Sequence, residues 1–166
     1  TDKSTMGSRQ RLPSRAFDSR AMKAQNDLQI DSRVTSAEEA IVVRGLLEFN
    51  EARLGPADDH PANFVARDAD GNVVGGILGR MRWRWLYIAK LWVDDSARGR
   101  GIGTRLMQAA EELASSRGCT DVSLDTFDFQ ARPFYEKLGY ELFGTLEGFP
   151  PGSRQYYLRK KLKPVT

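Results

Sequence analysis

The stretch ARGRGIGTRLM, residues 97–107, has glycines at positions 99, 101 and 103, arginines beside them and an apolar-periodic run directly after. Three interpretations compete: a pyrophosphate cradle, an RNA-binding segment of the RG type, and a plain loop entering a helix. The spacing fits neither the G-x-G-x-x-G fingerprint of dinucleotide folds nor the G-K-[ST] end of a P-loop. RG-type segments are repetitive and disordered, whereas this one occurs once between patterned elements. Glycines at a helix start leave backbone N–H groups open to an anion, which favours the cradle over the plain loop.

Positive charge is concentrated in the first 27 residues. The chain has 166 residues and a formal charge of +3, and residues 1–27 hold six basic and three acidic side chains, so they carry the whole excess. We predict a poorly ordered basic tail over 1–27 and a single folded domain over 28–163. Within the tail, Met6-Gly7-Ser8 is typical of an added leader and Met22 of a natural start, and both interpretations stay open. Because the remainder is formally neutral, a nucleic-acid partner is disfavoured.

Cysteine usage and hydropathy bear on the compartment. The single cysteine, Cys119, cannot form an intrachain disulfide and follows Gly118 between a helical and a strand pattern. This predicts a buried structural thiol in a reducing compartment. No apolar run approaches the roughly 20 residues that span a bilayer, and the N-terminus has no apolar signal core. We therefore expect a cytoplasmic protein without a membrane partner.

Hydrophobic periodicity predicts seven strands and three helices. A short alternation predicts a first strand over 28–34, and Thr35 or Ser36 caps a helix that ends near Gly55. The order β-α-β-β-β-α-β-α-β-β predicts an α/β sandwich on a mixed sheet. After the first helix come strands over 63–67 and 73–78 joined by a hairpin turn, a strand over 85–93, a helix from 102 closed by Gly118, a strand over 121–127, a short helix over 133–138, and strands over 140–146 and 155–162.

Two motifs resemble those of the GNAT superfamily of N-acetyltransferases. Arg98-x-x-Gly101-x-Gly103 is similar to the family signature R/Q-x-x-G-x-G/A, which follows a strand ending in L-x-V, here residues 91–93. The block ARPFYEKLGY, residues 131–140, resembles the family segment A-x-x-x-Y-x-K-x-G-F/Y. The element order agrees from about residue 28 to 162. The resemblance implies a GNAT-like α/β sandwich in which helices flank a central mixed, mostly antiparallel, splayed β-sheet.

The resemblance implies acetyl-coenzyme A as co-substrate and no metal. In the family, backbone amides of the signature hold the pyrophosphate, and the preceding strand pairs with the pantetheine arm. Arg98, with Arg100 or Arg105, would be the charge partners. Gln130 stands where the family often has an asparagine that contacts the cofactor arm. The expected cofactor-binding residues are Leu91, Trp92, Val93, Arg98, Gly99, Arg100, Gly101, Ile102, Gly103, Thr104, Gln130 and Lys137.

For catalysis, the resemblance implies direct attack of a neutral amine on the thioester carbonyl, with the leaving thiolate taking a proton. Tyr135 occupies the family's position for the acid, and a phenol suits the step because it stays protonated near pH 7. A packing role is the alternative for this ring. Some relatives carry a glutamate base where this chain has Ala89. A water chain or the amine's own ionisation is then expected to deprotonate the amine.

Acidic residues around the end of the first helix favour a cationic acceptor, such as an aminated sugar, a polyamine or a lysine side chain. They are Glu48, Glu51, Asp58 and Asp59, with Asn50 and His60 among them. Solvated surface charge is the alternative for any single one of them. We expect the acceptor site to include Glu48, Glu51, Tyr87 and Asp125.

Residues 80–85, RMRWRW, alternate arginine with large apolar side chains. A half-buried strand pair ranks first as the explanation, a homodimer interface second, and nucleic-acid stacking third.

The sequence therefore predicts an N-acetyltransferase, a transferase of the acyltransferase class, that moves the acetyl group of acetyl-coenzyme A to the primary amine of a small cationic molecule. Three alternatives stay open. One is a non-catalytic acyl-coenzyme A-binding or regulatory module, favoured by Ala89 and Gln130. The others are a protein-lysine or N-terminal acetyltransferase, and a nucleic-acid-binding protein that uses the tail and residues 80–84.

Overall fold

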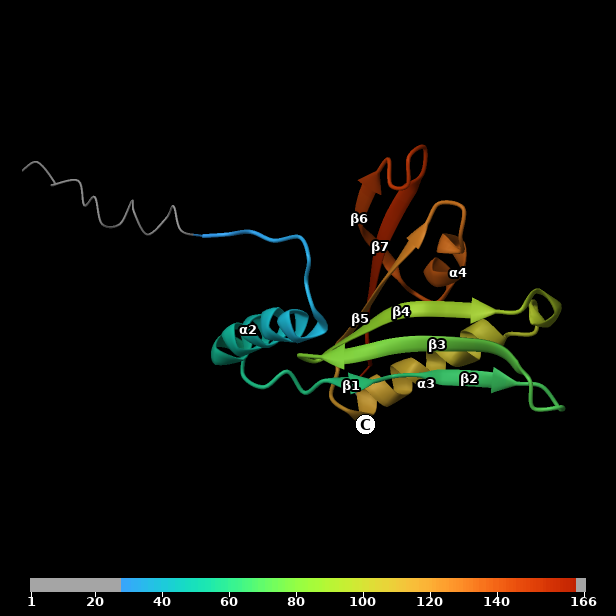
Figure 1. Ribbon diagram of the computed structural model, residues 1–166. Helices are drawn as coiled ribbons and strands as arrows, with labels where there is room; N and C mark the ends of the chain where they lie inside the picture. Colours follow the sequence, from blue (N-terminus) through green and yellow to red (C-terminus); the bar gives the residue numbers. More distant parts are fainter. Residues whose placement is uncertain (1–27, 164–166) are drawn as a thin grey trace, which may run out of the picture. The chain divides into compact units, whose positions relative to one another are not determined.

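The structure of the chain is a computed structural model that describes residues 28–163 (Figure 1). The chain divides into two compact units, the first ending at Gly45 and the second starting at Leu46. The tail predicted over 1–27 lies outside the described residues, and the single domain over 28–163 stays a prediction.

Helix α2 (Ser36–Leu54) begins at a capping box. The backbone N–H and the hydroxyl of Thr35 both donate to the Glu38 carboxylate at 2.7 Å, and the Glu38 N–H donates to the Thr35 hydroxyl at 3.3 Å. After the helix, Gly55 has a φ of +79°. The predicted cap and end of this helix are confirmed, and none of its residues is buried.

The strand predicted over 28–34 is wrong. The structure gives these residues no strand pairing, and they enter α2 as irregular chain. Alternating side chains predict the two faces that a strand would have, but a strand also needs a partner for its backbone, which alternation does not supply.

Seven strands form one sheet in the second unit, in the order β1-β3-β4-β5-β7-β6, with β2 also paired to β3 (Figure 1). Only β4 and β5 pair in parallel, so the sheet is mixed and mostly antiparallel, which confirms the predicted fold class. The element order is corrected at one point, because the first strand follows α2 and begins at His60. The strands are β1 (His60–Pro61), β2 (Phe64–Arg67), β3 (Val73–Arg82), β4 (Trp85–Val93), β5 (Asp121–Phe127), β6 (Glu141–Glu147) and β7 (Arg154–Lys161).

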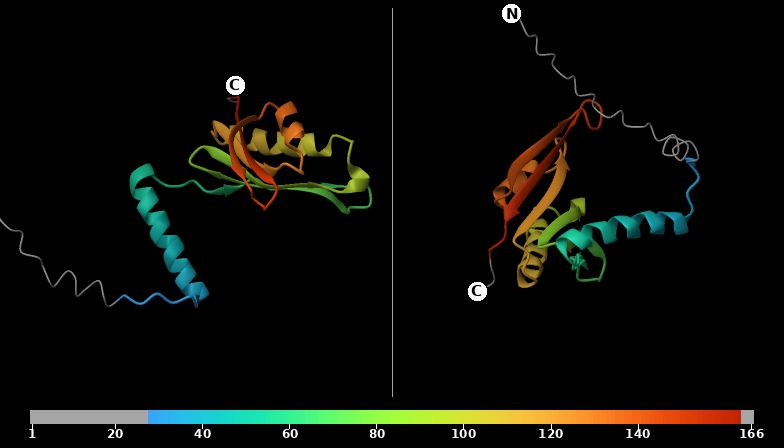
Figure 2. Two further views of the ribbon diagram at one scale, coloured as in Figure 1. Left: turned by 90° about the horizontal axis from the view of Figure 1, so that it is seen from above. Right: turned by 90° about the vertical axis from the view of Figure 1, so that its left-hand side faces the viewer.

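Helices α3 (Ile102–Ser116) and α4 (Arg132–Lys137) lie on the same face of this sheet (Figure 2). The core forms between them and the strands, because alternate strand residues and one stripe of α3 are buried there. Among the described helices, none is long and apolar enough to cross a membrane. The buried residues of the core include Ile77, Met81, Leu86, Ile88, Leu106, Met107, Ala110, Val122, Leu124 and Leu158.

A β-bulge interrupts β4 at Ala89. Ile88 pairs with Gly79 of β3 and Lys90 pairs with Leu78, so Ala89 has no residue opposite it. A bulge inserts one residue and reverses which side chains face the core. Ala89, at the position where some relatives have a glutamate as general base, is therefore the extra residue of this bulge.

The bulge also marks the point where β4 and β5 separate. Leu86 and Ile88 face the core before it, whereas Leu91 and Val93 pack against the core after it. Pairing between β4 and β5 ends at Ile88 opposite Leu124. Beyond this pair the two strands diverge toward their carboxyl ends (Figure 1), which creates an opening in the middle of the sheet.

Candidate active site

The opening between β4 and β5 exposes one backbone edge of β4. Its last three residues, Leu91–Val93, are hydrogen-bonded to Gly75–Ile77 of β3 on one side and pair with no described strand on the other. Free N–H and C=O groups along a strand edge can pair with an extended ligand as an added strand would. These three residues were predicted to bind the cofactor arm.

The loop after β4 leads through the short helix η1 (Asp95–Ala97) to the start of α3. Gly99 and Gly101 have φ values of +74° and +75°, a conformation that glycine adopts without strain. Gly101 is the N-cap residue of α3, and no side chain caps this helix. The N–H groups of the first turn, residues 102–104, are therefore available to an anion.

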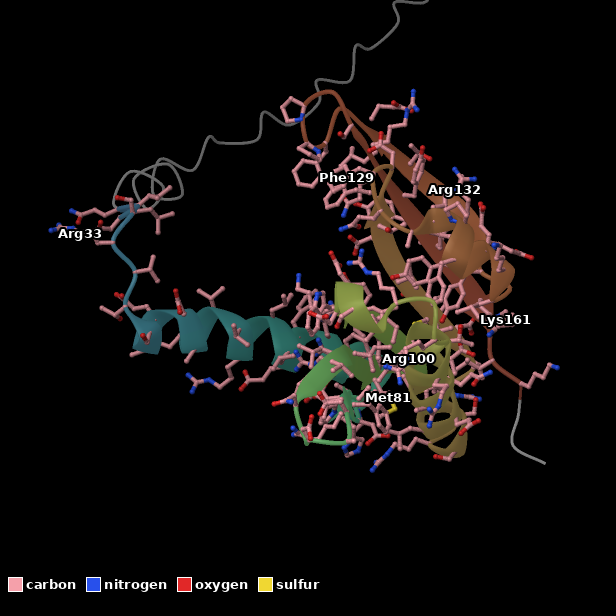
Figure 3. The ribbon with its side chains drawn as sticks, turned by 90° about the vertical axis from the view of Figure 1, so that its right-hand side faces the viewer. Arg33, Met81, Arg100, Phe129, Arg132 and Lys161 are labelled. Carbon is pink, nitrogen blue, oxygen red and sulfur yellow. The ribbon has the colours of Figure 1, made fainter. Side chains whose placement is uncertain are left out.

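Among the arginines of this loop, Arg98 has partners within the chain. Its Nε donates to the Val93 carbonyl at 3.2 Å and its Nη2 lies 2.7 Å from the Asp95 carboxylate. These bonds fold the loop back onto the end of β4. Arg100, labelled in Figure 3, and Arg105 are exposed near the start of α3 and are the freer candidates for a phosphate.

Gly103, the third glycine of the predicted cradle, packs against α4. A Cβ atom at this position would lie 3.3 Å from Cζ of Phe134, closer than ordinary van der Waals contact. This close approach brings α3 and α4 together beside the opening. The sequence indicated an anion at all three glycines, whereas the structure gives Gly103 a packing reason.

Tyr135, the predicted acid, lies on α4 in the core on the helix-covered face of the sheet and is 8% exposed. Its ring makes edge contacts with Phe134 and Tyr140, with centroids 5.1 and 6.0 Å apart. Within residues 28–163 its hydroxyl has no hydrogen-bond partner, and the only closed-off polar side-chain atoms without a partner are on Arg82. The Tyr135 hydroxyl is therefore free to donate its proton within the described part of the chain.

The surroundings of Tyr135 keep it protonated. Burial, followed by the negative charge of Asp125, raises the pKa of Tyr135 above its ordinary value of 10.0. Behind the ring, Tyr140 donates to Glu111 at 2.8 Å, and Lys160 donates to the other Glu111 oxygen at 2.6 Å. This part-buried network ties α3 to β7 and supports the wall against which Tyr135 packs.

On the other face of the sheet, Tyr87 and Asp125 meet across the opening. Tyr87 donates to one Asp125 oxygen at 2.7 Å, Gln155 donates to the other at 2.6 Å, and Tyr157 donates to Gln155 at 3.0 Å. The bond to Asp125, with burial and its charge, raises the pKa of Tyr87 to about 12. Among the described residues, Asp125 takes part in no salt bridge, so its negative charge has only neutral partners.

Gln130 lies in the turn after β5 and hydrogen-bonds back to the end of that strand. Its Oε1 accepts from the Thr126 hydroxyl at 3.0 Å and from the Phe127 N–H at 2.9 Å. The side-chain oxygen is thus occupied, and the NH₂ group is the part that can reach a ligand. Lys137, the last residue of α4, is exposed.

Three phenylalanines gather where β5 ends. Phe127 stacks on Phe129 at 5.2 Å with the rings 9° apart, and Phe149 from the β6–β7 turn lies 6.0 Å from Phe127. Phe129, labelled in Figure 3, and Phe149 are more than half exposed. Because Phe127 is two residues beyond Asp125, it lies on the same face of β5.

The acidic residues expected near the acceptor are not brought into this cluster. Glu48 and Glu51 are exposed on α2, and the Glu51 carboxylate accepts from the Ala57 N–H at 3.3 Å in the following turn. Asp58 pairs with His60 at 2.7 Å, and Asp59 pairs with Arg80. Of the four predicted acceptor residues, the structure therefore joins Tyr87 and Asp125 and leaves out Glu48 and Glu51.

Sequence reasoning missed Gln155 and Tyr157, which complete the Asp125 cluster. Both lie on β7, and Tyr157 stands opposite Asp125 in the antiparallel pairing. Their spacing of two was the available signal, since it assigns both to one face of a strand. Cys119 is buried as predicted, and burial raises the pKa of its thiol, which makes it unreactive.

Comparison with known proteins agrees with this architecture. Residues 28–140 match the model of the acetyltransferase (GNAT) family. A blasticidin-S acetyltransferase of Streptomyces morookaense is 42% identical over 93 residues, covering 55% of this chain and 68% of that protein. An acetyltransferase of Agrobacterium fabrum is 35% identical over 131 residues, covering 78% of this chain and 96% of that protein.

Solved structures with this fold include an acetyltransferase from Bacillus cereus. It is 31% identical, with a TM-score of 0.75, over 81% of this chain and 98% of that one. A structure described as a streptothricin acetyltransferase of Bacillus anthracis was solved in complex with acetyl coenzyme A. It is 24% identical over 61% of this chain and 62% of that one, with a TM-score of 0.55, and shares the fold.

Proposed function

The chain belongs to the GNAT family of acetyltransferases and is an acyltransferase enzyme, and from this premise we propose that it transfers acetyl from acetyl-coenzyme A to the amine of a small cationic molecule. One observation carries the proposal. Tyr135 is a protonated phenol whose hydroxyl has no hydrogen-bond partner among residues 28–163, and its pKa is raised in part by the charge of Asp125, a carboxylate whose partners in that range are neutral.

The residues around the opening suit acetyl-coenzyme A. The uncapped first turn of α3 and the two glycines before it can accept the pyrophosphate, with Arg100 and Arg105 as charge partners. The free edge of Leu91–Val93 can pair with the amide groups of the pantetheine arm. Gln130 can donate to that arm through its NH₂ group.

When bound, acetyl-coenzyme A supplies a thioester carbonyl that an amine can attack directly. Tyr135 holds the proton that the sulfur needs on leaving, since the raised pKa keeps the phenol protonated across the neutral range. Its freedom from other hydrogen bonds supports this role, because an acid that already donates elsewhere must break that bond first.

The acceptor site follows from the Asp125 cluster. A carboxylate whose partners are a phenol and an amide keeps its full charge available to an ammonium group. Tyr87 donates to Asp125 and can still accept a hydrogen bond from the amine through its own oxygen. Asp125, alone or through water, is our candidate for taking the amine proton in place of a base at Ala89.

The aromatic cluster and the relatives support a small acceptor with an apolar or planar part. Phe129 offers an exposed ring face beside the acceptor side of the opening. The relative named as a blasticidin-S acetyltransferase and the neighbour described as a streptothricin acetyltransferase are both named for small molecules.

The direct test is release of the coenzyme A thiol across a panel of amines. We expect turnover with at least one small cationic amine and slower turnover with a matched neutral amine. Binding of acetyl-coenzyme A without turnover on any amine would contradict the proposal. Turnover only on peptide amines would instead support a protein acetyltransferase.

A further inference from the structure

A hollow of about 560 Å³ lies between β2 and the first half of α3, and we call it the β2–α3 groove. Six consecutive residues, 64–69, line it from β2 and the turn that follows. The α3 residues in its lining are Ile102, Arg105, Leu106 and Ala109, and Arg100 precedes them in the chain. Because β3 and β4 lie between β2 and the opening that the proposed function uses, the groove is a separate site.

β2 is a border strand of the sheet (Figure 1). Its residues, Phe64–Arg67, pair with β3 on one side and with no described strand on the other. Alternate residues of such a strand direct their N–H and C=O groups outward, where an extended peptide can pair as an added strand. The groove is therefore lined by a strand whose backbone can hold a peptide.

Positive charge in the β2–α3 groove has no carboxylate partner. Arg67, Arg100 and Arg105 are exposed, and among residues 28–163 none of them forms a salt bridge. The Nη1 atom of Arg67 donates to the Gly71 carbonyl at 3.0 Å, which leaves its charge uncompensated. Three exposed guanidinium groups around one hollow repel one another, and an anionic ligand relieves that repulsion.

The one acid in the lining, Asp68, is engaged in its own turn. Its carboxylate accepts from the Asp70 N–H at 3.0 Å and from the Asn72 N–H at 2.8 Å, and the Asn72 side chain donates to its second oxygen at 3.1 Å. The lining thus has a formal charge of 3 − 1 = +2. This charge favours an acidic ligand over a neutral or a basic one.

The other groove residues provide an apolar floor. Phe64, Ala66 and Ile102 are half-buried and pack against the core, and Leu106 is buried. An inorganic anion would leave this floor in contact with water, whereas an extended peptide presents alternate side chains to two sides. A segment that alternates acidic and apolar residues can pair with the arginines and also cover the floor.

Protection of the sheet edge explains less of the groove. Charged side chains on border strands often prevent unwanted pairing, and this role would account for Arg67. It would not account for Arg105, which lies on α3 and lines the same hollow. Positive charge on both elements points to a ligand held between them.

We propose that the β2–α3 groove binds an extended acidic segment of another protein, which adds a strand to β2 and brings its carboxylates to Arg67, Arg100 and Arg105. The chain's own residues 1–27 do not match this chemistry, because they hold six basic side chains against three acidic ones. Arg100 and Arg105 are shared with the pyrophosphate site of the proposed function, whereas Arg67 and the edge of β2 belong to the groove alone.

The test uses the full chain and a labelled, end-blocked heptapeptide that alternates glutamate and valine, without acetyl-coenzyme A. We expect saturable binding by fluorescence anisotropy, with amide shifts in residues 64–69 and slower hydrogen exchange in β2. A peptide with lysine in place of glutamate should not bind. N-methylation of alternate amides should weaken binding about tenfold or more, because it removes strand hydrogen bonds. No saturation, equal binding of the lysine peptide, or shifts that leave residues 64–69 unchanged would overturn the proposal.

Variants at exposed arginines separate the groove from general charge. Arg67→Gln should weaken peptide binding about two- to fivefold, the range for an exposed ion pair. Arg117→Gln, at the exposed end of α3, should leave it unchanged. Thiol release from acetyl-coenzyme A should stay at the native rate in Arg67→Gln, so peptide binding and acetyl transfer can each fail alone. Equal losses in both variants would refute the site, as would association of the native chain with itself that Arg67→Gln abolishes.

Discussion

The two sides of the β4–β5 opening each present a tyrosine, and the two hydroxyls differ in what they bond. Tyr135, on the helix-covered side, is packed among aromatic rings and its hydroxyl has no partner in the described part of the chain. Tyr87, on the other face, is 45% exposed and its hydroxyl is bonded to Asp125. Both have a raised pKa, the first mainly from burial and the second mainly from the carboxylate.

Under the proposed function, these chemically identical groups have different roles. A buried phenol with a free hydroxyl can give its proton to a leaving group, whereas a phenol committed to a carboxylate holds that carboxylate in place.

The largest expected effect is on the helix-covered side. Tyr135→Phe keeps the ring and removes the proton donor, so kcat should fall about 100-fold or more, with little change in acetyl-coenzyme A binding. Thiol release with a reactive amine measures this. Tyr140→Phe is the matched control, because it removes a buried hydroxyl that bonds Glu111 instead. Equal loss in both variants would indicate a packing effect.

On the open side, Asp125→Asn removes the charge and keeps the shape. We expect kcat/KM for a cationic amine to fall about 10- to 100-fold, the range for losing a hydrogen bond to a charged group. A neutral amine should be much less affected. Asp70→Asn, in the exposed β2–β3 turn, is the control. A loss that is the same for cationic and neutral amines would argue against recognition by charge.

The packing of α3 on α4 beside Tyr135 can be tested by a pair of glycine substitutions. Gly103→Ala brings a Cβ atom against Phe134 and should lower the free energy of unfolding by about 1 kcal/mol. Gly45→Ala in α2 meets nothing within 4 Å and should raise it by about 0.5–1 kcal/mol. Chemical denaturation measures both, and a gain at both positions would show that Phe134 yields easily.

The smallest expected effect is on the pH dependence of the unfolding free energy, through Tyr87 on the open side of the sheet. The pKa of Tyr87 is about 12 in the folded chain against 10.0 ordinarily, so its contribution to stability is complete below pH 10 and is lost as the pH rises toward 12. Tyr87→Phe should therefore show a shallower fall in unfolding free energy over this range. Denaturation series at pH 8, 10 and 11.5 measure the slopes, and parallel slopes would mean that Asp125 does not hold the proton on Tyr87.

Elements that depend on local pattern were predictable, and the residues around α3 illustrate why. Its stripe of apolar residues, the glycines before it and Gly118 after it all lie within about twenty positions, and the structure agrees with each. The hairpin of β2 and β3 was predicted for the same reason, since its turn chemistry lies between its strands.

Contacts between distant residues were beyond such patterns. The bond from Gln155 to Asp125 joins residues 30 positions apart, and it exists because β7 pairs with β5 in one register. The strand predicted over 28–34 shows the opposite case. Its side chains alternate as in a strand, but no described strand pairs with its backbone. From the sequence, Glu48, Glu51 and Asp125 were equally good candidates for the acceptor site. The fold distinguishes them, because the first two lie on α2 and Asp125 lies on β5 beside Tyr87.

The order of residues along the chain was enough to predict the glycine loop before α3, the tyrosine of α4 and the family, because each depends on neighbours in sequence. The tertiary structure was needed to learn that Gly103 serves a helix contact, that Ala89 is the extra residue of a bulge, and that Asp125 has no cationic partner within residues 28–163. The reason is physical: hydrogen bonds and packing join atoms that are close in space, and a sheet brings together residues from strands far apart in the chain.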